Sequence, residues 1–130
     1  MDFRGVFAVA GIALVPLIAA ASPAGVLSQI QPGLWEFSGP RNAPVRRVCV
    51  GETPLLGQIE HQAPRCTRSV VRNDSALAVI DYDCPGAGFG HSEVTVLTPR
   101  SIRVQTQGIS AGAPFNYSVQ GRRVGSCQGH

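Results

Sequence analysis

The sequence predicts an all-β fold: a single small antiparallel meander, either a curled sheet or a small barrel, with one short helix and two disulfides. Fifteen glycines and ten prolines among 130 residues interrupt regular elements often, which favours short strands over long helices. Several short segments alternate between apolar and polar residues, the pattern of half-buried strands. The length suits one hydrophobic core and is too small for two.

The N-terminal segment has the pattern of a secretory signal. Residues 6–21 are apolar and uncharged, Arg4 precedes them, and they close on three alanines at 19–21. Small residues at that point are what signal peptidase accepts. We therefore expect residues 1–21 to be a cleaved signal peptide and the protein to be periplasmic or secreted.

The alternative interpretation of this segment is a retained membrane anchor. The apolar run is shorter than the roughly 20 residues that a helix needs to cross a bilayer, and Pro16 interrupts it. We expect no stable membrane span after cleavage. Residues 22–130, starting at Ser22, then form a single β-rich domain.

Four cysteines fall within the mature chain, namely Cys49, Cys66, Cys84 and Cys127. An even number in an exported protein predicts two disulfides. Zinc is the competing interpretation, but no pair has the Cys-x-x-Cys spacing of structural zinc sites. The sequence permits three connectivities.

The strand pattern favours one of these connectivities. Residues 66–71 and 76–84 flank a polar, turn-forming cluster and predict a β-hairpin that sets Cys66 opposite Cys84. Cys49 must then bond to Cys127, which requires the sheet to curl until its late strands approach its early ones. The cross-strand pairs in this register are Arg68 with Tyr82, Val70 with Ile80, and Val71 with Val79.

The remaining elements follow from alternation and turn residues. Thr53-Pro54 predicts the start of a short helix over residues 54–60, the only one expected in the mature chain. The expected strands cover residues 33–38, 45–50, 66–71, 76–84, 91–97, 101–105 and 115–120. The predicted core is Trp35, Phe37, Val48, Val50, Val70, Ile80, Val94, Val96, Ile102, Val104, Phe115, Tyr117 and Val119.

Three features together resemble the domain of unknown function 3617 family of exported proteobacterial proteins. They are the Pro-Gly-Leu-Trp-Glu run at residues 32–36, the four dispersed cysteines, and the Gly-Arg-Arg-Val-Gly-Ser-Cys ending at residues 121–127. The resemblance covers nearly the whole mature chain and implies a periplasmic β-rich domain, with no activity or ligand attached. The chain departs from many members in lacking their Met- and Thr-rich middle strands.

The start of the mature domain also looks like the Gly-x-Trp motif of lipocalin-type barrels, carried by Gly33 and Trp35. In those barrels the tryptophan closes one end and packs near a basic residue of a late strand. By analogy, Arg122 or Arg123 is the expected partner, with its guanidinium over the indole face.

No catalytic, metal or cofactor motif is present in the sequence. We expect His61, His91 and His130 to be solvated, and Asp81 and Asp83 to lie on the exposed face of a strand. The glycine-rich run at residues 86–90 is expected to be a flexible loop. We predict no cofactor and no enzymatic activity; a hydrolase is the weakest of the alternatives weighed.

The net charge of +3 is too small for the basic surface of a nucleic-acid binder, so nucleic acid is excluded as a partner. The leading hypothesis is a non-enzymatic periplasmic module that binds a small, partly apolar molecule, unless its own side chains fill the interior. The alternative is an envelope structural or stress accessory protein that contacts another protein through an exposed strand edge.

Overall fold

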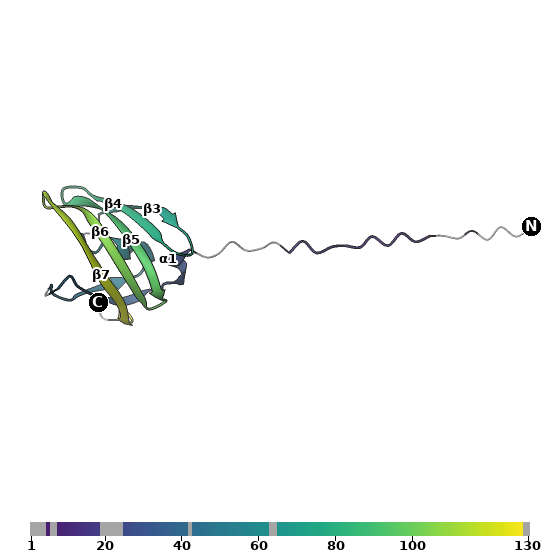
Figure 1. Ribbon diagram of the computed structural model, residues 1–130, viewed down its shortest axis with the longest axis horizontal. Helices are drawn as coiled ribbons and strands as arrows, with labels where there is room; N and C mark the ends of the chain where they lie inside the picture. Colours follow the sequence, from purple (N-terminus) through teal and green to yellow (C-terminus); the bar gives the residue numbers. More distant parts are fainter. Residues whose placement is uncertain (1–4, 6–7, 19–24, 42, 63–64, 129–130) are drawn as a thin grey trace, which may run out of the picture.

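The computed structural model contains one folded domain preceded by an extended segment. Residues 8–18 form no helix or strand, their side chains are exposed, and Figure 1 shows them leading away from the domain. The expected mature start at Ser22 and the expectation for His130 fall outside the described residues. The structure describes residues 5, 8–18, 25–41, 43–62 and 65–128.

One antiparallel sheet of seven strands makes up most of the domain, in the order β2-β1-β7-β6-β5-β4-β3. Figure 1 shows β3 to β7 side by side in a curved layer, and β1 continues this meander by pairing with β7. The sheet does not close, because β2 and β3 remain its edges, so a barrel is wrong and the curled sheet is confirmed. The strands are β1 (Gly33–Ser38), β2 (Arg46–Val50), β3 (Thr67–Asn73), β4 (Ala78–Cys84), β5 (Gly88–Thr98), β6 (Ser101–Ser110) and β7 (Ala113–Gly125).

Two short helices cover the concave face of the sheet. The expected helix over residues 54–60 is instead a single 3-10 helix, η1 (Thr53–Gly57), which contacts β4, β5 and β6. The one α-helix of the described residues is α1 (Val26–Gln29), which packs against β5 and η1 and lies outside the predicted range. The N-terminus of α1 is held from far away in sequence: the amide of Leu27 donates to Oδ1 of Asn73 at 3.2 Å. No local sequence pattern predicts this cap, because its acceptor lies 46 residues away.

The core lies between the concave face and these helices. Of the predicted core residues, Val70 does not belong to the core: its side chain is 43% exposed on the edge strand β3. Phe115 is only half-buried. The prediction also missed the apolar residues of the irregular segments, because these show no strand alternation. The core residues missed in these segments are Val26, Leu27, Ile30, Leu56 and Ile59, and Ala78 of β4 was missed as well.

The predicted disulfides and most of the hairpin register are confirmed. Cys66 bonds to Cys84 and Cys49 to Cys127, with Cα atoms 4.2 Å and 5.5 Å apart. A bulge in β3 shifts the register, so that Val79 pairs with Arg72 rather than with Val71. The other two predicted pairs, Arg68 with Tyr82 and Val70 with Ile80, are present.

Candidate functional site

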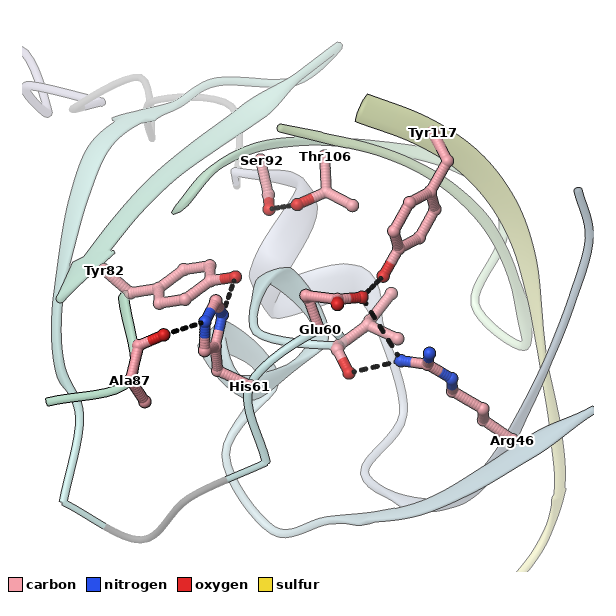
Figure 2. Close-up of polar contacts among 9 residues, drawn as sticks. Arg46, Glu60, His61, Tyr82, Ala87, Ser92, Thr106 and Tyr117 are labelled. Carbon is pink, nitrogen blue, oxygen red and sulfur yellow. Dashed lines mark hydrogen bonds and ion pairs between the residues drawn. The ribbon is translucent and has the colours of Figure 1, made fainter. Parts of the chain in front are cut away.

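A group of polar side chains lies on the concave face, under the segment that follows η1. The segment starts close to the sheet, because η1 ends at Gly57, where a Cβ would lie 2.9 Å from Cδ1 of Ile80. Strands β4 to β7 contribute Tyr82, Ser92, Thr106 and Tyr117, whose side chains point inward by alternation. Figure 2 shows how Glu60, His61 and Arg46 approach them.

His61 is buried within this group, which contradicts the expectation of a solvated histidine. Its Nε2 lies 3.2 Å from the carbonyl oxygen of Ala87, which can only accept, so Nε2 donates. In the neutral ring, Nδ1 then accepts the hydroxyl of Tyr82 at 2.9 Å (Figure 2). The ring also contacts Phe115. With both nitrogens engaged, His61 holds the segment to the sheet.

Glu60 is the acceptor of a second set of contacts. Its Oε2 accepts the hydroxyl of Tyr117 at 2.6 Å and lies 3.5 Å from Nη1 of Arg46. The same Nη1 donates to the carbonyl oxygen of Ile59 at 3.2 Å (Figure 2). Burial raises the pKa of the Tyr117 hydroxyl, and its hydrogen bond to Glu60 raises this pKa further. The carboxylate and the guanidinium neutralise each other, so the set carries no net charge.

Ser92 fastens η1 to the sheet. Its Oγ lies 2.5 Å from the carbonyl oxygen of Gly57 and 2.7 Å from Oγ1 of Thr106. Because the carbonyl only accepts, Ser92 donates to Gly57 and accepts from Thr106. This contact was missed, although the alternation that places Val94 inward also places Ser92 inward.

A partly open hollow, which we call the end cavity, adjoins the Glu60 set. Its volume is about 240 Å³, and Arg46 and Tyr117 form part of its wall. Apart from these two side chains and Gly39, its lining is apolar. The lining residues are Phe37, Gly39, Pro40, Ala43, Pro44, Arg46, Ile59, Tyr117 and Val119.

The Gly33 and Trp35 motif has a structural role. Gly33 has φ of +146°, and a Cβ there would lie 2.5 Å from the carbonyl oxygen of Gly125 and 2.6 Å from Nε of Arg123. Arg123 pairs with Trp35 across the strands, and its Nε donates to the carbonyl oxygen of Pro32 at 2.8 Å. Stacking of Arg123 on the indole stays a prediction.

Arg122, the other expected partner of the motif, points elsewhere. Its side chain is exposed, and its Nη2 lies 3.7 Å from Oε1 of Glu36. Of the two arginines, Arg123 is therefore the one associated with the motif.

The two aspartates of β4 lie on the outer, convex face of the sheet, as predicted. Asp83 is exposed, and Asp81 is partly exposed. Asp81 pairs with His91 of β5, and its Oδ1 lies 2.5 Å from Nδ1 of that ring. The glycine-rich run at residues 86–90 is not all loop, because β5 begins at Gly88.

Within the described part of the chain, no group of three His, Cys, Asp or Glu residues is placed to hold a metal ion. The helices described there are all too short to cross a membrane. No protein-family model matches the chain, and no curated protein or solved structure is significantly similar to it.

Proposed function

We propose that this protein is an exported, non-enzymatic module that binds a small, partly apolar molecule in the end cavity. The observation that carries the proposal is an apolar hollow of about 240 Å³ with two polar side chains, Arg46 and Tyr117, in its wall. Apolar walls with a few convergent polar groups are typical of ligand sites. Typical sites measure about 300–1,000 Å³, so the ligand must be small.

Apolar side chains occupy the middle of the fold. Trp35, Leu56, Ile80 and Ile102 are fully buried there and pack in one cluster. The domain therefore differs from a hollow barrel, and its ligand would enter at the end of the sheet, beside the loop that contains Ala43.

The charges around the end cavity favour a neutral ligand. Arg46 already faces Glu60, whose side chain is only 18% exposed. A ligand anion would compete with Glu60, and a ligand cation would compete with Arg46, each at the cost of leaving a charge without its partner. A hydroxyl or carbonyl group on an apolar body can hydrogen-bond here without separating the pair.

Export rests on two observations. The disulfides indicate a chain that folds in an oxidising compartment. The N-terminal residues have the charge, apolar run and closing alanines of a secretory signal, and the apolar side chains of residues 9–18 take no part in the core of the domain. The periplasm is the location that we propose, and membership of the domain of unknown function 3617 family stays a prediction.

Three probes of one size and different charge test the proposal: benzyl alcohol, benzoate and benzylamine. We expect saturable binding of benzyl alcohol, seen as NMR shifts at Ile59 and Val119, and much weaker binding of the two ions. Ala43→Phe should abolish this binding, because a phenylalanine at this lining position would occupy the cavity. Ala43 is exposed, so the substitution should leave the core intact. Ala76→Phe, at an exposed position in the β3–β4 turn, is the matched control. Tighter binding of either ion, or undiminished binding by Ala43→Phe, would overturn the proposal.

A second candidate function, contact with an envelope protein, is favoured by the exposed edge strand β3. Val71 is 57% exposed there, and an edge strand offers unpaired backbone groups to a partner strand. Native mass spectrometry of protein isolated from its own periplasm distinguishes the two functions. A retained small molecule supports the end cavity, whereas a retained protein that is lost with Val71→Pro supports the edge.

A further inference from the structure

The outer face of the sheet carries a second, larger hollow that is separate from the end cavity. It is an open groove of about 580 Å³ over β4, β5, β6 and β7, the strands that Figure 1 shows side by side. Most of the side chains that line it come from two rows, one across all four strands and one across β5, β6 and β7. Tyr82, Gly90, Gly108 and Phe115 complete the lining. No arginine lines the groove, although the chain has eleven.

The first row is polar and follows from the register. Asp81 pairs with His91, His91 with Gln107, and Gln107 with Asn116. Directly paired residues point to the same face, so a carboxylate, an imidazole and two carboxamides stand in line. Neighbouring strands are about 4.8 Å apart, so the row is about 14 Å long.

The second row is mostly apolar and lies two residues along each strand from the first. Phe89 pairs with Ile109, and Ile109 with Pro114. Phe89 is 52% exposed, a large aromatic ring left in solvent on the face of a sheet. Between the two rows lie Gly90 and Gly108, which have no side chain, and next to them Tyr82 and Phe115, which also line the groove although alternation turns their side chains towards the concave face.

We propose that this groove binds a linear, uncharged oligosaccharide. Sugar rings combine an apolar C–H face, which packs on an aromatic ring, with hydroxyls that both donate and accept. Carboxamides offer both donors and acceptors at one position, which suits such hydroxyls. A row of about 14 Å fits a chain of sugars rather than a single ring.

The chemistry of the groove argues against two other ligand classes. Phosphate or sulfate groups would call for arginine, and the lining contains none. An extended peptide needs partners for its own backbone, which proteins usually supply at a sheet edge. The groove crosses the middle of the sheet, where strands β5 and β6 are already paired on both sides.

Titration with cellotetraose, followed by NMR and calorimetry on the full domain, tests the proposal. We expect saturable shifts at residues of both rows and about tenfold weaker binding of cellobiose. Phe89→Ala should weaken binding about tenfold through lost apolar contact. Gln107→Ala and Asn116→Ala should each weaken it about two- to tenfold, the range of a single hydrogen bond.

Leu97→Ala is the matched control, because Leu97 is similarly exposed, at 53%, on the same strand and outside the groove. If Phe89→Ala lowers the melting temperature, Phe89→Leu keeps an apolar side chain but removes the flat ring, and it should still weaken binding. Ala43→Phe should leave cellotetraose binding unchanged, which separates this site from the end cavity.

Three results would overturn the proposal. The first is a failure of both cellotetraose and the uncharged N-acetylglucosamine tetrasaccharide to bind at saturating concentration. The second is tighter binding of tetra-alanine than of either sugar. The third is an affinity that neither Phe89 variant changes.

Discussion

Cys127 lies beside Cys49 although 78 residues separate them, with 5.5 Å between their Cα atoms. Cys49 stands opposite Leu34 of β1, and Leu34 stands opposite Gly125 at the end of β7. The tail after Gly125 therefore passes the end of β1 to reach β2. The disulfide ties one edge of the sheet to the C-terminal tail.

This bridge should contribute more to stability than Cys66–Cys84, which closes a span of only 18 residues. In the chain-entropy model, spans of 78 and 18 residues differ by about 1.3 kcal/mol in the free energy of unfolding. The paired variants Cys49→Ser/Cys127→Ser and Cys66→Ser/Cys84→Ser avoid a free thiol. We expect urea unfolding to show a loss of about 2 to 5 kcal/mol for the first and a smaller loss for the second. The reverse order would contradict the prediction.

Gly33 should not tolerate a side chain. Its φ of +146° suits glycine, and a Cβ would lie 2.5 Å from the carbonyl oxygen of Gly125. We expect Gly33→Ala to destabilise the domain by more than about 1 kcal/mol in thermal or urea unfolding. Gly51→Ala is the control, because a Cβ there meets nothing within 4 Å and no positive φ is imposed. Equal stability of the two variants would show that the β1–β7 contact can relax.

The pairing within the hairpins was predictable because it depends on local alternation, whereas the pairing of β1 with β7 joins strands far apart in the sequence. Val94 pairs with Val104 and Val96 with Ile102, and in each strand the two apolar residues lie two positions apart and so share one face. The pairing of Cys66 with Cys84 follows from the same rule. These features need only a hairpin turn and the period of a strand.

The candidate sites were not predictable in the same way. His61 is buried because an irregular segment folds back under the sheet, and nothing in its neighbours encodes that path. The outer groove needs Gly90 to be a strand residue; the sequence suggests a loop there. A Cβ on Gly90 would lie 2.4 Å from the Tyr82 ring, so glycine serves close packing here rather than flexibility.

Asp74 should make the domain less stable in acid. The amide of Ala76 and the side chain of Arg72 donate to its carboxylate and lower its pKa from 3.8 to about 2. A pKa lowered in the folded state gives stability that is present above pH 3.8 and is lost as the pH falls towards 2. We expect Asp74→Asn to flatten the dependence of urea unfolding on pH in this window. Since the side chain is exposed, the effect should be small and should shrink with added salt.

Tyr82 and Tyr117 are the only tyrosines of the chain, so tyrosinate absorbance reports on these two alone. Burial raises the pKa of Tyr82 from 10 to about 12, and the charge of Glu60 adds to the effect. Burial likewise raises the pKa of Tyr117, and its hydrogen bond to Glu60 adds to that effect. A pKa raised in the folded state gives stability that is complete below pH 10 and is lost as the pH rises through 12.

The folded protein should therefore show no tyrosinate absorbance step near pH 10. The step should instead coincide with alkaline unfolding, which circular dichroism follows. The protein unfolded in guanidinium chloride is the control and should titrate near pH 10. A full step of two tyrosines at that pH in the folded protein would contradict the burial of both hydroxyls.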